Sequence, residues 1–333
     1  MTSPSPDIPK AAWEAREVLV LRNPRSGTGH GPEKIRSLVD ELGKRGLRTT
    51  VHSDQQEFSA AVRAGVAENR LRAVVSAGGD GTAEFVVSQI PPELPMAVFP
   101  LGTENLLAKY LGWTTDARRV AESIELRRIL QLDAAIVATP DGSERLFLLM
   151  LGCGFDAAVV ERLHACRTGP ISHWSYVKPI IDSVRAYKYP KLTVNCYDAE
   201  GRALAEPQDA RWAFVFNFPY YAMGLGICSD ADPRDGTLDV ITFPGRTLWN
   251  GLYNLAAVLL GRHRQLRGVE VVRAARLRIT AEHAVPIQLD GDPAGHLPVE
   301  VRVLPKHWTA VVPGDRAVKD SAGSLPSERM EKR

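Results

Sequence analysis

Residues 73–82 of the chain read Ala73-Val74-Val75-Ser76-Ala77-Gly78-Gly79-Asp80-Gly81-Thr82. The first four residues form a short, mainly apolar run rich in valine, which predicts a buried strand. The glycine-rich stretch from Gly78 to Thr82 predicts a turn, and we expect a helix to follow it. A strand that enters a helix through such a turn is the repeating unit of an α/β protein with a parallel sheet.

The same order of elements recurs on both sides of this stretch. Upstream, Val18 to Leu21 predicts a buried strand, and a loop from Asn23 to Gly31 follows it before Pro32 opens a helix. Downstream, Met96 to Phe99 predicts a strand that leads into a loop, PLGTEN at positions 100–105, and a helix through Tyr110. A further strand covers Thr49 to His52. We therefore expect a mainly parallel α/β sheet in the N-terminal third.

After about Leu132 the pattern changes to short apolar runs, which are typical of strands in an antiparallel sheet. These runs are Ile136–Val137, Phe147–Leu149, Leu192–Val194, Phe214–Phe216, Leu238–Ile241, Leu277–Ile279 and Val299–Leu304. Two helical stretches interrupt them, near Trp174–Tyr187 and Leu248–Leu260. A chain of 333 residues exceeds the size at which one hydrophobic core usually stops growing, so a second, β-rich sandwich domain is expected.

The amino-acid composition is that of a globular protein without a membrane-spanning segment. Hydrophobic residues make up 44% and charged residues 24% of the chain, which is ordinary for a globular protein. The formal net charge of +2 gives no general reason to expect a nucleic-acid partner. The N-terminus has no apolar core of a signal peptide, and no apolar run reaches the ~20 residues needed to span a bilayer. We expect a cytoplasmic protein; if it meets a membrane, it does so at the inner face and by its surface only.

The four cysteines show no spacing typical of a zinc site or a redox motif. In a cytosolic protein they are expected to be buried or half-buried reduced thiols. They are Cys153, Cys166, Cys196 and Cys228.

The three loops of the first third lie where a parallel sheet places its ligands, at the carboxyl ends of strands. All three are rich in glycine and leave backbone amides for an anion, and the dipole of a following helix favours phosphate. Glycine is also a plain turn residue, so a purely structural role is the alternative. Neither the P-loop signature nor GxGxxG with a downstream acidic residue is present, which excludes these two ordinary nucleotide sites.

These loops resemble those of the diacylglycerol kinase catalytic domain, which sphingosine kinases, ceramide kinases and bacterial lipid kinases share. The resemblance rests on Gly78-Gly79-Asp80-Gly81-Thr82, with Asn23-Pro24-x-Ser26-Gly27 before it and Pro100-x-Gly102-Thr103-x-Asn105 after it. It continues through Gly154-Phe155-Asp156-Ala157, Asp230 to Val240 and Gln288 to Pro293, and spans about Val18 to Pro313. GGDGT alone also occurs in NAD kinases and phosphofructokinases, whereas the full series is far more specific.

The resemblance implies an N-terminal nucleotide-binding α/β domain, like that of NAD kinases and phosphofructokinases, and a C-terminal antiparallel β-sandwich domain, with ATP and substrate between them. The expected boundaries are a disordered N-terminus at 1–15, the α/β domain at 16–132, the β-rich domain at 133–306, a strand returning to the first domain at 307–315 and a disordered tail at 316–333.

The implied activity is transfer of phosphate from ATP, with Mg²⁺, to a lipid hydroxyl at a membrane surface. Diacylglycerol is the first candidate lipid, and a sphingoid base or ceramide-like lipid is the next. The protein could form a homodimer, but the sequence does not decide its oligomeric state.

The resemblance also assigns roles to residues. Acid–base candidates are Asp290 and Asp292, because a carboxylate can accept the hydroxyl proton directly or through water. Asp80 is the third acidic candidate, for Mg-ATP or the substrate hydroxyl. Asp290-Gly291 is equally a common hairpin turn. The residues implied to hold the nucleotide are Asn23, Pro24, Arg25, Ser26, Gly27, Ser53, Gly78, Gly79, Asp80, Gly81, Thr82, Glu84, Gly102, Thr103 and Asn105.

A magnesium site away from the chemistry is implied at a second place. Asp232, Asp235 and Thr237 match a family site in which one carboxylate and two backbone carbonyls hold the ion. Oxygen-only ligands suit Mg²⁺. A plain turn is the alternative for this stretch.

Some positions depart from the family pattern. Glu84 stands where the family has Asn, Glu104 stands where a small or neutral residue is usual, and Asp292 replaces a Glu. Additional carboxylates near phosphates repel ATP unless a cation offsets them, and Arg25 and Lys109 are the candidates.

A run of arginines follows the apolar helical stretch Leu248–Leu260, with only Glu270 opposing them in the sequence. It is either a face that docks on an anionic membrane or a solvated surface. The arginines are Arg262, Arg264, Arg267, Arg273, Arg276 and Arg278.

Two other functions stay open beside the lipid kinase. One is a kinase of a soluble substrate, NAD above all, against which the β-rich C-terminal series argues. The other is a nucleotide- or lipid-binding regulator without turnover, which Glu84, Phe85 and Glu104 favour. The sequence does not identify the lipid.

Overall fold

The computed structural model describes residues 14–24, 26, 31–165, 187–221, 226–245 and 248–314. Arg25, Gly27, Cys166, most of the expected helix near Trp174–Tyr187 and nearly all of the two expected disordered ends lie outside the described residues. The chain divides into two compact units. The first unit is Met1–Gln131 with Trp308–Arg333, and the second unit is Leu132–His307.

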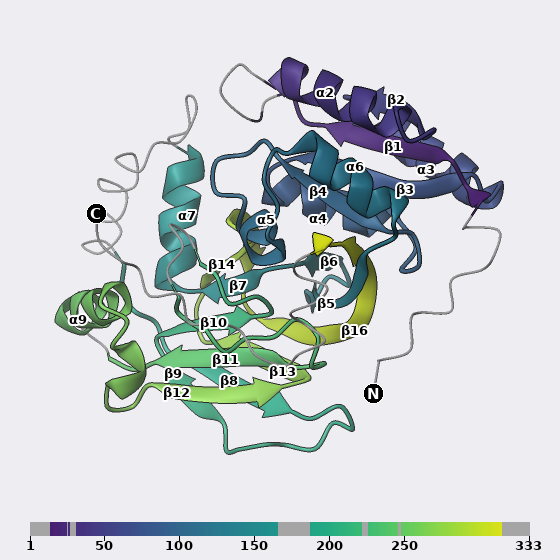
Figure 1. Ribbon diagram of the computed structural model, residues 1–333. Helices are drawn as coiled ribbons and strands as arrows, with labels where there is room; N and C mark the ends of the chain where they lie inside the picture. The colour runs from purple at the N-terminus through teal and green to yellow at the C-terminus, as the bar shows by residue number, and fades with distance from the viewer. Residues whose placement is uncertain are drawn as a thin grey trace. The chain divides into compact units, whose positions relative to one another are not determined.

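The first unit is built on a parallel sheet, as predicted (Figure 1). Each pairing along the order β2-β1-β3-β4-β16 is parallel, and β16 joins β4 through Ala310 and Met96. The strands are almost fully buried at the centre, as expected for a sheet covered on both faces. They are β1 (Glu17–Arg22), β2 (Arg48–His52), β3 (Leu71–Gly78), β4 (Met96–Pro100) and the C-terminal end of β16 (Val299–Val311).

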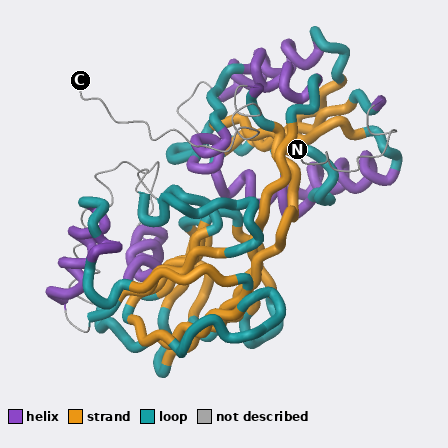
Figure 2. Tube along the Cα trace, turned by 60° about the horizontal axis from the view of Figure 1, so that its bottom comes forward, coloured by secondary structure: helices purple, strands orange, loops and turns teal. Residues whose placement is uncertain are grey.

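Helices lie on both sides of these strands in Figure 2. They are α2 (Gly31–Gly43), α3 (Gln55–Ala67), α4 (Asp80–Gln89), α5 (Leu106–Leu111) and α6 (Ala117–Glu125). Ile35, Leu38 and Leu42 give α2 one buried face at helical spacing. The sequence reading predicted α2, α4 and α5 but not α3 and α6. Both missed helices begin at an aspartate N-cap, Asp54 and Asp116, which is the signal that could have found them.

The second unit contains two antiparallel layers, which confirms the predicted β-rich domain. One layer is a six-stranded sheet in the order β12-β11-β10-β7-β14-β15. The other has the order β16-β13-β8-β9, with β5 and β6 paired beside it. The strands are β5 (Ile129–Ala138), β6 (Glu144–Phe147), β7 (Met150–Cys153), β8 (Leu192–Tyr197), β9 (Gln208–Ala210), β10 (Trp212–Phe216), β11 (Leu238–Phe243), β12 (Glu270–Ala274), β13 (Arg276–Ala281), β14 (Pro286–Leu289) and β15 (Asp292–His296).

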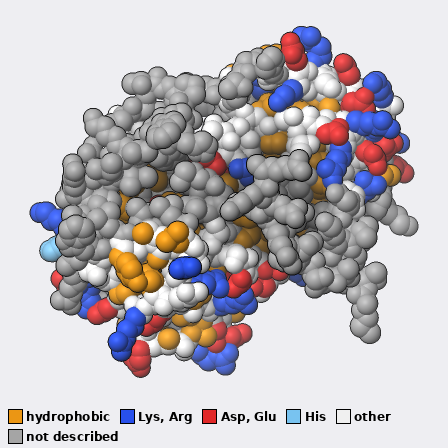
Figure 3. Space-filling model, turned by 60° about the vertical axis from the view of Figure 1, so that its left-hand side comes forward, with side chains coloured by type: hydrophobic (Ala, Val, Ile, Leu, Met, Phe, Trp, Pro, Cys, Tyr) orange, Lys and Arg blue, Asp and Glu red, His pale blue; other side chains and the backbone are white. Residues whose placement is uncertain are grey.

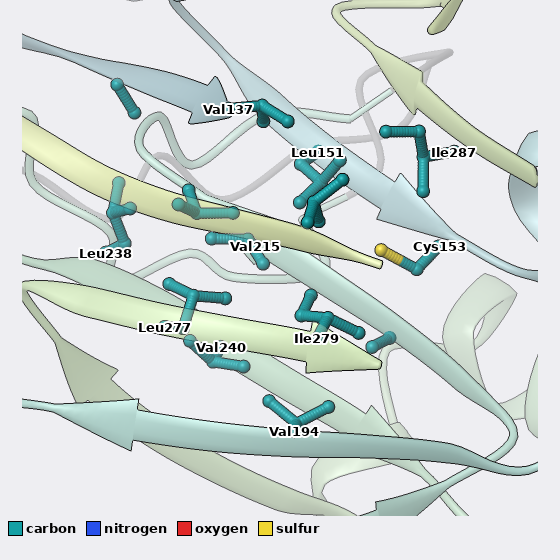
Figure 4. Packing of buried hydrophobic residues seen from close by; sticks show 14 of the residues in the cluster. Val137, Leu151, Cys153, Val194, Val215, Leu238, Val240, Leu277, Ile279 and Ile287 are labelled. Atoms are coloured by element: carbon teal, nitrogen blue, oxygen red, sulfur yellow. The ribbon is translucent and has the colours of Figure 1, made fainter. Parts of the chain in front are cut away.

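The core of the second unit is formed by the inward side chains of both layers. Figure 4 shows Leu151, Val215 and Ile287 from one sheet meeting Val194 and Ile279 from the other. Alternate residues of β8 are buried, as expected of a strand with one covered face. Cys153 and Cys196 belong to this core, and they are free and buried together with Cys228.

Helices α7 (Phe155–Ala165) and α9 (Leu248–Leu259) and the short 3₁₀ turn η3 (His263–Gln265) complete the described second unit. The predicted helix at Leu248–Leu260 is confirmed. The predicted strand Phe147–Leu149 is divided instead, because β6 ends at Phe147 and β7 starts at Met150. The amides of Leu148 and Leu149 donate to the carboxylate of Asp290 and not to a neighbouring strand.

In the described part of the chain, no helix is long and apolar enough to cross a membrane.

Candidate functional site

Three turns meet at one edge of the first unit, because β1, β3 and β4 are neighbours and run parallel. The backbone amides of Leu101 and Gly102 both donate to the carbonyl oxygen of Gly78, at 2.9 and 3.2 Å. The side-chain amide of Asn23 reaches the hydroxyl of Thr82 at 3.4 Å. The turns after the first, third and fourth strands are therefore joined into one structure.

Two of these turns approach so closely that side chains are excluded. A Cβ atom on Gly102 would lie 2.5 Å from the Cα of Gly79, and one on Gly78 would lie 2.3 Å from the Thr82 hydroxyl oxygen. Real Cβ atoms essentially never come within 3.0 Å of such atoms, so glycine at 102 is required by the backbone of the neighbouring turn, and glycine at 78 by the side chain of Thr82. The result is a surface of the turn lined by main chain, on which an anion can approach backbone amides.

Asp80 connects the second turn to the third. Its two carboxylate oxygens accept from the amides of Leu106 and Leu107, each at 2.9 Å, and so cap the first turn of α5. The side chain of Asn105 holds the same turn by accepting from the amide of Gly102 and donating to its carbonyl oxygen, at 3.0 and 2.8 Å. Burial raises the pKa of Asp80, although the two amide hydrogen bonds oppose the shift. Asp80 thus has a structural role in the described turn.

Among the described turns of this unit, the N-terminus of α4 is suited to phosphate. The first amides of a helix have no partner within the helix, and the N-cap here is Gly79, which has no side chain to satisfy them. By contrast, the carboxylate of Asp54 already caps α3 by accepting from the amides of Gln56 and Glu57. Ser53 lies exposed immediately before that cap, at the carboxyl end of β2.

Glu104 and Glu84, the two glutamates that differ from the family pattern, have different surroundings. The carboxylate of Glu104 lies 3.8 Å from the ammonium of Lys109, which was one of the two cations proposed to offset it. Thr103, beside it in the third turn, is exposed. Glu84 is half-buried on α4.

In the second unit, Asp290 and Gly291 form the tip of the hairpin between β14 and β15. Both have positive φ, 50° and 94°, which is the geometry of a two-residue type I′ turn. The carboxylate of Asp290 accepts from the amides of Leu148, Leu149 and Met150 at 2.7, 2.8 and 2.8 Å. The hairpin tip is thereby fastened to the start of β7.

Asp292 lies two residues further along the hairpin in a different environment. Its side chain is 58% exposed, and one carboxylate oxygen lies 3.8 Å from Nδ1 of His164 on α7. A second pair between the same two elements joins His296 and Glu161 at 3.9 Å. Asp292 therefore presents an accessible carboxylate beside α7.

A chain of hydrogen bonds leads inward from this hairpin. The side-chain oxygen of Gln288 accepts from the amide of Gly291 at 2.8 Å, and its nitrogen donates to the carboxylate of Asp156, also at 2.8 Å. The hydroxyl of Tyr221 donates to the other oxygen of Asp156. Burial raises the pKa of Asp156 to about 6, and the bonds from Tyr221 and Gln288 oppose the shift. The sequence analysis assigned no individual role to Asp156 or Gln288, which it used only as part of the family resemblance. A carboxylate in the apolar stretch at 150–159 was the available signal.

The stretch proposed for magnesium is a turn held by other contacts. The carboxylate of Asp232 forms two bonds with the guanidinium of Arg234, at 2.7 and 2.8 Å. Asp235 accepts from the amide and the hydroxyl of Thr237 at 2.9 and 2.7 Å. A cation at Asp232 would have to compete with Arg234. The described residues contain no cluster of three or more acidic, His or Cys side chains that could hold a metal. A site of one carboxylate and two backbone carbonyls is not of that kind, so magnesium at Asp232, Asp235 and Thr237 stays a prediction.

The buried carboxylate of Asp133, which the sequence analysis did not identify, holds the turn at residues 232–237 in place. Asp133 accepts from the amides of Gly236 and Lys306 at 2.8 and 2.7 Å, and its own amide donates to the carbonyl oxygen of Pro233. Burial raises the pKa of Asp133, with a further contribution from the charges of Asp235 and Asp232. The turn is thus positioned by contacts within the second unit.

The sequence-predicted residues gather in two groups, one in each unit. The first unit holds the described nucleotide candidates: Asn23, Pro24, Ser26, Ser53, Gly78, Gly79, Asp80, Gly81, Thr82, Glu84, Gly102, Thr103 and Asn105. The second unit holds Asp290 and Asp292 on one hairpin and Asp232, Asp235 and Thr237 on another turn. Arg25 and Gly27 lie outside the described residues.

Comparison with known proteins gives a consistent pattern over most of the chain. Residues 17–137 match the family model of the diacylglycerol kinase catalytic domain, and residues 150–312 match that of the YegS C-terminal NAD kinase beta sandwich-like domain. A protein of Mycobacterium tuberculosis named diacylglycerol kinase is 26% identical over 88% of this chain and 94% of its own length. Human diacylglycerol kinase zeta is 24% identical, over 95% of this chain and 37% of its own length.

Solved structures agree on the fold. A structure from Bacillus anthracis strain Sterne has a TM-score of 0.68 at 18% identity, covering 91% of this chain and 99% of that one. A second structure from the same strain, described as a diacylglycerol kinase, has a TM-score of 0.62 at 16% identity, covering 91% and 98%. At this identity the likeness concerns the fold alone.

Proposed function

Because residues 17–137 belong to the diacylglycerol kinase catalytic domain family and residues 150–312 to the YegS C-terminal domain family, we propose that the protein is a lipid kinase. The reaction is transfer of the γ-phosphate of Mg-ATP to a hydroxyl of a lipid, with diacylglycerol the first candidate and a sphingoid-like lipid the next. The observation that carries the proposal is the set of three joined turns at the carboxyl ends of β1, β3 and β4, lined by main chain where Gly79 meets Gly102.

The first unit is proposed to hold the nucleotide. Phosphoryl transfer needs positioning of the phosphates and neutralisation of their charge, and a glycine-lined turn at a helix N-terminus supplies backbone amides for both. Gly79 to Thr82 at the start of α4 would face the phosphates, with Asn23 and Thr103 beside them. Magnesium would accompany ATP as part of the substrate. Lys109 offsets the charge of Glu104, so this departure from the family pattern does not by itself argue against ATP binding.

The second unit is proposed to supply the base. Asp290 accepts three backbone hydrogen bonds, so both of its carboxylate oxygens are already occupied in holding the turn. Asp292 is exposed, which leaves its carboxylate available to a substrate hydroxyl. We therefore assign proton acceptance to Asp292, and the positioning of its hairpin to Asp290. Asp80 is assigned to positioning of the nucleotide turns, because both of its oxygens cap α5.

The test is transfer of labelled γ-phosphate from Mg-ATP to a mixed lipid extract. We expect labelled product that partitions into chloroform from the wild type, and a loss of about 10²-fold or more in Asp292→Asn, the usual effect of removing a general base. Asp209→Asn is the matched control, because that side chain is also largely exposed, at 63%, in the same unit. Labelled product in the aqueous phase would instead indicate a kinase of a soluble substrate.

A parallel measurement separates Asp290 from Asp292. Asp290→Asn leaves backbone amides with a poorer acceptor and is expected to lower the free energy of unfolding by about 1–3 kcal/mol, measured in urea. Asp292→Asn is expected to leave the free energy of unfolding unchanged. ATP binding without any labelled product from the wild type would favour the non-catalytic regulator and would contradict the lipid kinase.

A further inference from the structure

The outer face of α9 is apolar and exposed. Tyr253 is 63% exposed and Leu260, directly after the helix, is 71% exposed, which makes them the two most exposed large hydrophobic residues of the described chain. They are seven positions apart, or two helical turns, and the exposed Ala256 lies on the same face. Such a stripe is unusual for a surface that faces only water.

This face is held in place by the opposite face of the helix. Ala257 and Val258 are buried, and the buried side chain of Asn254 donates to the carbonyl oxygen of Pro244 at 3.0 Å. After the helix, His263 is buried with its ring nitrogen 2.8 Å from the carbonyl oxygen of Ile227. The exposed stripe is therefore presented by an anchored element.

The charges next to the stripe are positive. From Val240 to Val269 the sequence contains no Asp or Glu. Arg262 and Arg267 are exposed in the turn after α9. Figure 3 looks onto the side of the molecule where α9 lies and shows exposed hydrophobic side chains together with Lys and Arg side chains.

The structure reduces the number of arginines that are candidates for membrane contact. Three of its members face carboxylates other than Glu270, because folding brings Asp230 to Arg264, Asp239 to Arg273 and Glu300 to Arg278. Arg276 and Arg278 also belong to β13, in the other layer of the second unit. Of the three arginines in the turn after α9, Arg264 is paired with Asp230, which leaves Arg262 and Arg267 as the exposed members that follow the apolar stripe in the chain.

We propose that Tyr253 and Leu260, together with Arg262 and Arg267, form a surface that docks on a bilayer containing anionic phospholipid. The apolar side chains enter the boundary of the acyl region, and the guanidinium groups bind lipid phosphates. A second copy of the chain is a poorer occupant. A two-fold interface through this face would bring like-charged arginines of both copies together, which disfavours association.

The experiment is co-sedimentation of the full chain with vesicles of phosphatidylcholine alone or of phosphatidylcholine and phosphatidylglycerol in equal amounts. We expect binding to the mixed vesicles that weakens with added salt. Arg262→Glu with Arg267→Glu, and separately Tyr253→Ser with Leu260→Ser, are each expected to lower the affinity by about tenfold or more. The matched control is Leu126→Ser with Arg118→Glu, because Leu126 is 54% exposed and Arg118 is exposed in the first unit.

Unchanged binding of both double variants, or equal loss in the control, would overturn the proposal. So would self-association that disappears in Tyr253→Ser with Leu260→Ser while vesicle binding persists, since the face would then join two copies. The single variant Tyr253→Ser, with the melting temperature measured alongside, guards against misfolding. Vesicle binding needs no phosphate transfer, so its outcome is separate from that of the kinase assay.

Discussion

Asp290 and Asp292 lie two residues apart on one hairpin, yet their carboxylates have different surroundings. Three backbone amides hold the first, whereas the second is exposed beside His164. The sequence reading identified both residues as candidates but did not separate their roles. The separation depends on Leu148, which lies 142 positions from Asp290 in the chain. No local pattern around the hairpin contains that partner.

At the same scale, Asp156 predicts a dependence of stability on pH. Its pKa is raised from 3.8 to about 6, so the folded state binds the proton more tightly than the unfolded state. Stability from this group is therefore present at low pH and is lost as pH rises from about 4 to 6, by about 3 kcal/mol in total. Asp156→Asn removes the titration.

The measurement is urea unfolding of the wild type and Asp156→Asn at several pH values between 4 and 7. We expect the difference in unfolding free energy between the two proteins to shift in favour of the variant across this range. A difference that stays constant with pH would show that Asp156 does not titrate in the folded protein.

At the scale of elements, the contact between the turns after β3 and β4 makes a specific prediction. Gly102→Ala places a Cβ atom 2.5 Å from the Cα of Gly79, so the two turns must separate. We expect a loss of ATP affinity of about tenfold or more, together with a lower melting temperature, measured by titration calorimetry and thermal unfolding. The control is Gly43→Ala at the end of α2, where a Cβ atom meets nothing within 4 Å. Equal ATP affinity in the two variants would contradict the assignment of these turns to the nucleotide.

Capping also acts at the scale of elements. Asp54 and Asp116 cap the helices that follow them in sequence, whereas Asp80 caps α5 from a turn that lies 26 positions earlier. The first kind of cap is visible in a sequence, because the residue immediately precedes the helix. The second kind appears only when two strands are paired and bring their turns together.

At the scale of the whole molecule, β16 is a strand with residues in both units. Its N-terminal part pairs with β13 in the second unit, and its C-terminal part pairs with β4 in the first. In the first unit, Trp308 is fully buried, and the indole nitrogen of Trp113 donates to the carbonyl oxygen of Val311 at 3.0 Å. Loss of a single buried tryptophan side chain costs about 3–5 kcal/mol, a large share of the stability of a domain.

A chain that ends at His307 is therefore expected to lose the folded first unit and to retain the folded second unit. Scanning calorimetry should show the loss of one unfolding transition, and chemical shifts of the second unit should persist. A chain that ends at Gly314 keeps the described contacts of β16 and serves as the control. If the shorter chain also kept both units folded, β16 would be dispensable to the first unit.

Features that depend on neighbouring residues could be predicted from the amino-acid sequence. Valine-rich strands that enter glycine turns, and short alternating runs after Leu132, are local patterns, and they identified the α/β fold, the β-rich fold and the turns that carry the candidate site. The folded structure was needed to show which carboxylate is held and which is exposed, that Arg234 binds Asp232, and that Tyr253 and Leu260 are exposed on and directly after α9. The physical reason is that these outcomes depend on hydrogen bonds, ion pairs and burial. Such contacts arise only when the strands are paired, and even a short-range pair such as Asp232–Arg234 needs the folded turn to bring its side chains together.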